Sequence, residues 1–180
     1  MDFKILNEQN SEPLQLKNEP FKIFGELIVS RDLNGWNYEV KEYELQNIFE
    51  QTFPDENYEL SKINKKGFAI GVFEENVIVG LAIFEYNWNK MLYLLDLKVC
   101  KKYRRKNVAR QLLKKVETIA KKKGYHGLWT IGQNNNLGAC LFYLNYGFEI
   151  GGLNTMVYEQ TSQKGKQDIY FYYNFKKENI

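Results

Sequence analysis

The stretch DLKVCKKYRRKNVARQLL, residues 96–113, decides the fold of this chain. It starts inside an apolar run, residues 91–99, that has the composition of a buried strand. Residues 101–106 are then almost wholly cationic. Beyond this loop, apolar residues recur at helical spacing, at Val108, Leu112, Val116 and Ile119. We therefore predict a strand, a basic loop and an amphipathic helix that begins near Asn107.

The junction between this loop and the helix has the chemistry of an anion site. The first turn of a helix carries backbone N–H groups without intrahelical acceptors, together with the positive end of the helix dipole. Both point back toward the cationic residues 101–106. We therefore predict that a phosphate group binds here, held by the main chain as much as by side chains.

The junction resembles the pyrophosphate loop of the GNAT superfamily of N-acetyltransferases, which reads Arg/Gln-x-x-Gly-x-Gly/Ala. The corresponding residues here are Arg104, Arg105, Lys106, Asn107, Val108 and Ala109. Asn107 departs from the pattern, because the family usually has Gly where the backbone approaches the phosphates or adopts an unusual conformation. Asn tolerates left-handed backbone angles better than other residues with side chains, although a Cβ at a point of close approach could weaken cofactor binding.

A second group of residues resembles the other half of the GNAT site. In that pattern a strand ends at an Asn-rich turn, a short helix carries an aromatic pair, and Gly-Phe leads into the next strand. The matching residues are Gln133, Asn134, Asn135, Asn136, Ala139, Phe142, Tyr143, Gly147 and Phe148. Without the resemblance, the three asparagines are still typical of a turn and helix N-cap, and Gly147 suits the end of a helix.

The resemblance extends over most of the chain to the streptothricin acetyltransferase branch of that superfamily. Shared pieces include residues 21–28, 87–89, 127–128, 150–151, 154–156 and 170–175. It fails at Leu95 and Ile131, where members of that branch usually carry acidic residues. A polycationic antibiotic needs carboxylates to replace the water around its ammonium groups. The resemblance therefore implies the fold and the chemistry more strongly than it implies streptothricin as the substrate.

The implied fold class is α+β (mixed α/β), a GNAT-like acyl-CoA N-acyltransferase fold with helices flanking a central, mostly antiparallel twisted sheet. The 180 residues, of which 44% are hydrophobic, suffice for a real core, and we predict one GNAT N-acetyltransferase domain over residues 1–180. Further strands are predicted from alternation and turn residues at 36–45, 68–73 and 77–84, with a turn at 87–90. Residues 47–64 are polar and are expected to form one or two short helices or a loop.

The reaction that the resemblance implies is transfer of an acetyl group from acetyl-CoA, as cosubstrate, to a primary amine of a small molecule. The amine must lose a proton before it attacks, and Asp96, Glu85 or a chain of water molecules is expected to accept it. The backbone N–H of Val99 is expected to donate a hydrogen bond to the thioester carbonyl oxygen as negative charge develops on it. The family pattern assigns protonation of the departing CoA thiolate to Tyr143, whose alternative role is that of a core aromatic residue.

The same resemblance gives a set of residues that are expected to contact acetyl-CoA. They are Leu97, Val99, Arg104, Arg105, Lys106, Asn107, Val108, Ala109, Arg110, Asn134, Asn136, Ala139 and Tyr143. Asn136 is expected to hold the pantetheine arm, and the backbone of Leu97 and Val99 to pair with it like an added strand.

Two other functions stay open at this point. Asn107 and the missing acidic pair allow a protein that binds acetyl-CoA but has lost catalysis. The formal net charge of +3 and the 16% of aromatic residues allow a basic nucleic-acid-binding module, although no single-strand recognition signature accompanies them. The lysines after residue 113 are better explained as a solvated helix face than as a nucleic-acid surface.

The remaining features limit the cofactors and the location. Cys100 and Cys140 are too few for a disulfide framework and lack metal-ligand spacing, so no metal is expected. The lone His126 is expected in a turn. A charged-then-apolar leader and a membrane-spanning apolar run are both absent, which predicts a cytoplasmic protein without membrane partners. The aromatic residues 170–173 are expected either to finish the sheet or to form a homodimer contact.

Overall fold

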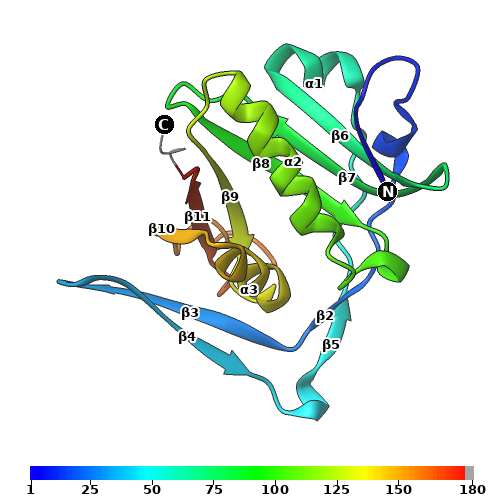
Figure 1. Ribbon diagram of the computed structural model, residues 1–180. Coiled ribbons are helices and arrows are strands. Elements are labelled where there is room, and N and C mark those ends of the chain that lie inside the picture. The colour runs from blue at the N-terminus through cyan, green and yellow to red at the C-terminus, as the bar shows by residue number, and fades with distance from the viewer. Residues whose placement is uncertain (177–180) are drawn as a thin grey trace. The chain divides into compact units, whose positions relative to one another are not determined.

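The structure is a computed structural model that describes residues 1–176. Its residues group into two compact units (Figure 1). The first unit contains residues 1–19, 52–128 and the segment that follows residue 173. The second contains residues 20–51 and 129–173. The prediction of a single domain therefore stays a prediction.

The sheet of the first unit is antiparallel throughout. Its strands, in spatial order, are β1 (Asp2–Ile5), β6 (Gly67–Glu74), β7 (Val77–Glu85) and β8 (Met91–Val99). The predicted strands at 68–73, 77–84 and 91–99 are confirmed. The turn between β6 and β7 has positive φ at Glu75 and Asn76, which is the backbone that a two-residue hairpin with right-handed twist requires.

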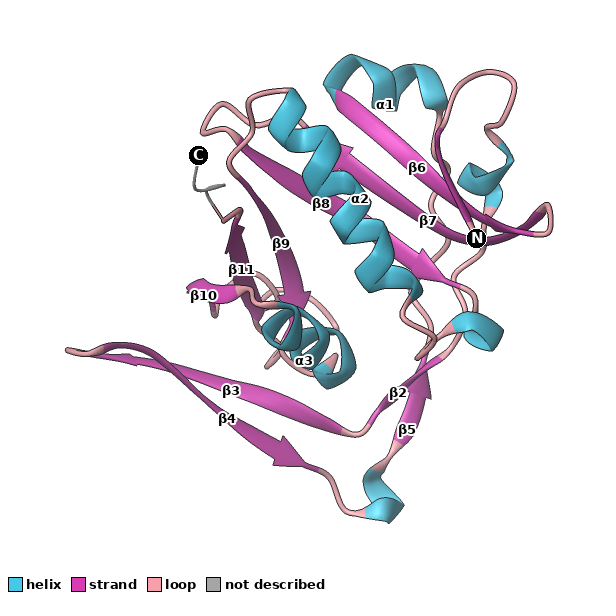
Figure 2. Ribbon diagram, in the orientation of Figure 1, coloured by secondary structure: helices cyan, strands magenta, loops and turns pink. Residues whose placement is uncertain are grey.

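Two α-helices belong to the first unit, together with the 3-10 turns η1 (Glu12–Gln15) and η3 (Lys101–Tyr103). The helix α2 (Val108–Lys122) begins where the sequence predicts, and it packs on β7 and β8, as Figures 1 and 2 show. The short helix α1 (Leu60–Lys66) inserts Ile63 into a core with Leu81 and Ile83. Because side chains alternate along a strand, Ala82 and Phe84 point to the opposite face of β7.

The second unit is built from short strands and one helix. Its elements are β2 (Phe21–Ile23), β3 (Gly25–Asp32), β4 (Gly35–Glu42), η2 (Leu45–Asn47), β5 (Phe49–Gln51), α3 (Leu137–Tyr146), β10 (Glu149–Asn154) and β11 (Asp168–Asn174), with most of β9 (Gly127–Gln133). Strand β3 pairs with β4 and β2 with β5. The predicted strand at 36–45 is confirmed. The prediction for residues 47–64 misses β5, but the expected short helix is present as α1.

The aromatic segment near the carboxyl end finishes a sheet. β11 pairs antiparallel with β10 and neighbours β9, and the side chains of Ile169 and Phe171 are completely buried. Tyr170 and Tyr172 stack on Trp129. Of the two roles expected for residues 170–173, the structure therefore assigns the one within the fold.

Candidate active site

The loop that leads into α2 adopts a conformation that L-residues rarely take. Arg105 and Asn107 both have positive φ, of 61° and 66°. Asn107 is the N-cap of α2, in the left-handed region, and its side chain makes no capping hydrogen bond. The carbonyl of Asn107 accepts the first intrahelical bond, from the N–H of Gln111. The N–H groups of Val108 and Ala109 therefore have no intrahelical acceptor and point toward the loop.

This backbone conformation allows a test of what Asn107 contributes. We expect Asn107→Val to lower the free energy of unfolding by about 1–2 kcal/mol, because a β-branched residue pays the full cost of the left-handed backbone. The lost amide makes no capping bond and is exposed, so its removal adds little. Urea denaturation measures the change. The matched control Asn107→Gly is expected to be at least as stable as the parent chain, and equal loss in both variants would contradict a backbone origin.

Arg104 and its two neighbours have different surroundings. Its Nε donates to the carbonyl of Val99 at 3.0 Å, and its Nη2 donates to the carbonyl of Glu19 and lies 3.7 Å from the carboxylate of that residue. The same carboxylate accepts the N–H of Lys101. Arg104 thus ties the loop to the strand end, whereas the adjacent Arg105 and Lys106 are exposed. The donors available to an anion are therefore these two cations and the amides of the first helical turn.

A β-bulge shapes the middle of β8. Ile83 pairs with Asp96 and Phe84 with Leu94, so Leu95 is the extra residue on β8. As a result Asp96 lies on the same face as Ile83, the face that packs against α1. Leu97 pairs with Ala82 and therefore points to the opposite face, as does Val99 two residues later.

Asp96 belongs to a polar network around the buried Lys98. The Tyr58 hydroxyl donates to its Oδ2 at 3.1 Å, and the Lys98 Nζ lies 3.4 Å from the same oxygen. Lys98 also donates to Glu56 Oε2 at 2.6 Å. Burial raises the pKa of Asp96, and the nearby Lys98 ammonium opposes that rise. Burial, followed by the charge of Asp96, raises the pKa of Tyr58, so its phenol stays a neutral donor.

A shallow pocket of about 280 Å³ opens beside this network. Its lining residues come from α1, the segment before it, and β7 and β8: Asn57, Tyr58, Glu59, Lys62, Ile63, Lys65, Lys66, Ile83, Glu85 and Leu95. Glu85 lies at the end of β7, on the same face as Ile83. The ion pairs among the described residues do not include Glu85, whereas Glu59 pairs with Lys62 at 2.7 Å. Glu85 is therefore the carboxylate in this pocket that is open to a cationic ligand.

The Asn-rich turn of the second unit holds several segments together. The Asn136 side chain caps α3 by accepting from the N–H of Ala139 at 3.3 Å, as the sequence predicts for an N-cap. Asn134 is buried; its Oδ1 accepts from the N–H of Gln167 and its Nδ2 donates to Glu26. The side chain of Asn134 thus bonds to two other segments, and among residues 1–176 that of Asn136 bonds to the start of α3.

Tyr143 lies in an aromatic cluster. Its ring contacts Phe142, Phe148 and Phe171 at centroid distances of 5.4–5.5 Å, and 8% of its surface is exposed. The helix ends as predicted at Gly147, which has a positive φ and donates to the carbonyls of Tyr143 and Leu144. The structure thus shows the core packing that was the alternative role of Tyr143, and its role as general acid stays a prediction.

The predicted site residues fall into one group in each unit. The first unit holds Asp96, Glu85, Leu97, Val99 and the loop from Arg104 to Arg110, and the second holds Asn134, Asn136, Ala139 and Tyr143. The sequence analysis missed Lys98 and Tyr58. A charged residue two positions from Asp96 in an otherwise apolar strand is the signal that would have indicated Lys98, whereas nothing in the sequence links Tyr58 to it.

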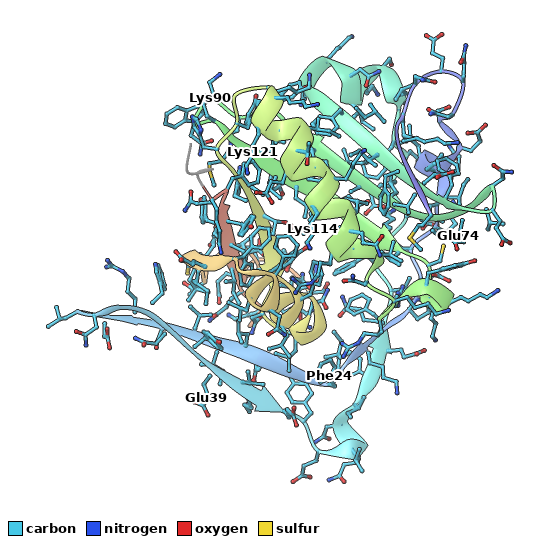
Figure 3. All side chains as sticks on the ribbon, in the orientation of Figure 1. Phe24, Glu39, Glu74, Lys90, Lys114 and Lys121 are labelled. Carbon is cyan, nitrogen blue, oxygen red and sulfur yellow. The ribbon has the colours of Figure 1, made fainter. Side chains whose placement is uncertain are left out.

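Other site types find little support. His126 is exposed in the turn after α2, as predicted. Within residues 1–176 no group of three or more His, Cys, Asp or Glu side chains is placed to hold a metal ion. The helices of the same residues include none that is long and apolar enough to cross a membrane. On α2, Lys121 pairs with Glu117 at 3.1 Å, and Figure 3 shows Lys114 on the same helix.

Comparison with known proteins places these observations in a family. The model of the acetyltransferase (GNAT) family matches residues 35–148. Streptothricin acetyltransferase A of Bacillus subtilis (strain 168) is 31% identical over 92% of this chain and 95% of its own length. Streptothricin acetyltransferase of Escherichia coli is 27% identical over 58% of this chain and 60% of its own length.

Solved structures agree with the sequence comparison. A candidate streptothricin acetyltransferase from Bacillus anthracis str. Ames, in complex with acetyl coenzyme A, superposes with a TM-score of 0.84 at 27% identity, over 96% of this chain and 98% of its own. Nourseothricin acetyltransferase superposes with a TM-score of 0.78 at 20% identity, over 96% and 97% of the two chains. The predicted fold class is thereby confirmed. Because the family model spans more than half of the sequence and a relative above 30% identity covers nearly all of it, the chain belongs to the GNAT family of acetyltransferases.

Proposed function

We propose that this acetyltransferase transfers the acetyl group of acetyl-CoA to a primary amine of a small molecule that binds beside the bulge of β8. The observation that carries the proposal is the pocket that joins an apolar floor to one open carboxylate, Glu85. A carboxylate there attracts an ammonium group and then accepts its proton. The names of the similar proteins make a streptothricin-type antibiotic the polycationic acceptor against which smaller amines are compared, and its turnover would mean that the chain confers resistance.

The donor groups at the start of α2 fit the pyrophosphate of acetyl-CoA. The exposed Arg105 and Lys106 supply positive charge, and the amides of Val108 and Ala109 supply directed hydrogen bonds. Arg104 holds this loop in place through its hydrogen bonds to the carbonyls of Val99 and Glu19. Arg110, the residue after Ala109, is the last of the proposed contacts of the pyrophosphate. We keep Leu97, Val99, Asn134, Asn136 and Ala139 as the proposed contacts of the pantetheine arm.

Three groups of the chain would then carry the chemistry. Glu85 accepts the proton that the amine must lose before its nitrogen attacks the thioester. The N–H of Val99 stabilises the oxygen that gains negative charge, and loss of such a donor typically costs about 3 kcal/mol of transition-state stabilisation. Tyr143 gives a proton to the thiolate as it departs. Asp96 acts as a positioning residue, because its oxygen holds Lys98 and Tyr58 in place.

Thermal melting with acetyl-CoA tests the cosubstrate before any acceptor is known. At a concentration 100 times the dissociation constant, a ligand adds about 2.7 kcal/mol to stability. For a chain of this size we expect the melting midpoint to rise by roughly 5–10 °C. ATP at the same concentration is the control for unspecific binding of phosphates. A similar rise with both compounds, or none with either, would contradict the assignment of the loop to acetyl-CoA.

Three further properties are proposed with the activity. A cytoplasmic location is supported by Cys100 and Cys140, which are both free; burial raises the pKa of the Cys140 thiol to about 12, so it stays unreactive. A homodimer is supported by exposed apolar side chains on the β3–β4 hairpin, such as Tyr38. A single domain over residues 1–180 is supported by the relatives that match nearly the whole chain. Light scattering tests the homodimer, and a single thermal melting transition tests the single domain.

A further inference from the structure

Lys98 is a charged residue at a position that a strand normally fills with an apolar one. It lies in β8, opposite Leu81, and only 7% of its side chain is exposed. Burial of an ammonium group is costly unless its charge and its hydrogen-bond donors are matched. The surroundings of Lys98 must therefore supply a complete set of acceptors.

The residues around Lys98 supply this set of acceptors. An ammonium group has three donors, and the Lys98 Nζ lies 2.6 Å from Glu56 Oε2, 3.4 Å from Asp96 Oδ2 and 3.4 Å from the carbonyl of Leu16. The Tyr58 ring lies beneath it, 5.4 Å from centroid to Nζ. The two carboxylates are also engaged elsewhere, because Asn18 donates to Glu56 Oε2 and Tyr58 to Asp96 Oδ2. One oxygen of each carboxylate, Glu56 Oε2 and Asp96 Oδ2, thus already has two partners within the protein.

The network borders the pocket directly. Tyr58 belongs to both, and Leu95 of the pocket precedes Asp96 at the bulge. The pocket floor is apolar, made by Ile63, Ile83 and Leu95. Its charged lining consists of three lysines and two glutamates, an excess of one positive charge, which the group of Lys98, Glu56 and Asp96 beside it offsets with one negative charge.

We propose that Lys98 determines acceptor specificity: its ammonium group occupies Glu56 and Asp96 as a built-in cation, so the pocket takes an acceptor with one ammonium group and an apolar body. This inference rests on the proposed function of the pocket as the acceptor site. The acceptor's ammonium group pairs with the carboxylate of Glu85, and its apolar body packs against Ile63, Ile83 and Leu95. A polycation would bring its second ammonium group toward the lysines of α1, while Lys98 already pairs with Glu56 and Asp96 beside the pocket.

The test measures binding, so that it does not depend on catalysis. Isothermal titration in the presence of CoA gives dissociation constants for 2-phenylethylamine, a monoamine with an apolar body, and for spermidine, a polyamine. We expect the parent chain to bind 2-phenylethylamine at least tenfold more tightly than spermidine. In Lys98→Met, which keeps the length of the side chain, spermidine is expected to bind at least tenfold more tightly than in the parent, while 2-phenylethylamine changes less than twofold.

The matched control is Lys17→Met. Lys17 also pairs with an acidic residue of the segment before α1, Asp55 at 3.2 Å, but its side chain is exposed, so both amines are expected to bind as in the parent. Lys98→Arg, which retains the charge, is expected to keep the parent's preference. A parent chain that prefers spermidine overturns the inference, and this comparison stands even if Lys98→Met does not fold. An unchanged spermidine affinity in a folded Lys98→Met also overturns it.

Release of CoA thiol from acetyl-CoA, measured in separate samples with the same variants and amines, separates this inference from the proposed function. The expected preference in binding, without turnover of any amine, leaves the role of Lys98 supported and contradicts the proposed transfer reaction. Turnover of polyamines in preference to monoamines supports the transfer reaction and contradicts the role of Lys98. A chain that binds neither amine contradicts both.

Discussion

Tyr143→Phe is expected to lower kcat by about 10² to 10⁴, the range that a positioned general acid contributes. The change removes one oxygen atom and leaves the ring, whose contacts with Phe142, Phe148 and Phe171 hold the helix in place. Stability should therefore change little, and loss of activity then reports the phenol itself. The measurement is steady-state release of CoA thiol with a fixed amine acceptor.

The control lies one turn further along the same helix. Tyr146 packs against Phe142, Phe148 and Tyr173. Because Tyr146→Phe keeps the ring and these contacts, we expect its kcat to stay within about twofold of the parent's. A general acid also gives the parent a decline of kcat at high pH, as the phenol loses its proton, and Tyr143→Phe should lack that decline. Equal kcat in the parent and Tyr143→Phe would mean that the aromatic cluster is the whole role of this residue.

The strands β6, β7 and β8 and the helix α2 are predictable from local pattern because their signals do not compete, whereas β1 was not predicted. Strand β8 is bounded by the Asn87–Lys90 turn and the basic loop, and both of its ends agree with the prediction. The start of α2 follows from apolar spacing alone. Even the conformation at Asn107 follows from the residue type, since Asn accepts the left-handed backbone that the family's Gly provides.

The bulge at Leu95 is the point where local reading of the sequence fails. Leu92 and Leu94 are completely buried, and the next apolar residues on their face are Leu97 and Val99. The spacing of three between Leu94 and Leu97 is the sequence signal of the extra residue, but it is easily missed in a run of leucines. Without the bulge, Asp96 would be assigned to the wrong face.

The network around Lys98 could not be predicted, because its members are far apart in the sequence. Lys98 is joined to Glu56 and Leu16, which lie 42 and 82 residues away. The segment before α1 is acidic, but in the structure Glu56 pairs with Lys98 and Asp55 with Lys17. Charge that looks available in the sequence is thus neutralised by partners that only the fold brings near.

Glu85→Gln is expected to lower kcat/KM by about 10² to 10⁴, because it removes both the charge that attracts the ammonium group and the acceptor of its proton. Gln has nearly the same size, so the β7 end and the pocket should keep their shape. An alkylamine has a pKa near 10.4, so without a base only the small neutral fraction reacts. The residual activity of the variant should therefore rise about tenfold for each pH unit between 7 and 9.

Two matched carboxylate variants decide whether this assignment is specific. Glu59→Gln alters the other acidic residue of the pocket, which is already paired with Lys62, and should keep kcat/KM within about twofold. Asp96→Asn retains a hydrogen-bond acceptor for Tyr58 and should cost about tenfold or less, as expected for a positioning residue. The reverse order, with Asp96→Asn nearly inactive and Glu85→Gln close to the parent, would move the role of base to Asp96. Because burial raises the pKa of Asp96, the parent's activity would in that case fall with decreasing pH at a higher pH than an exposed carboxylate would give.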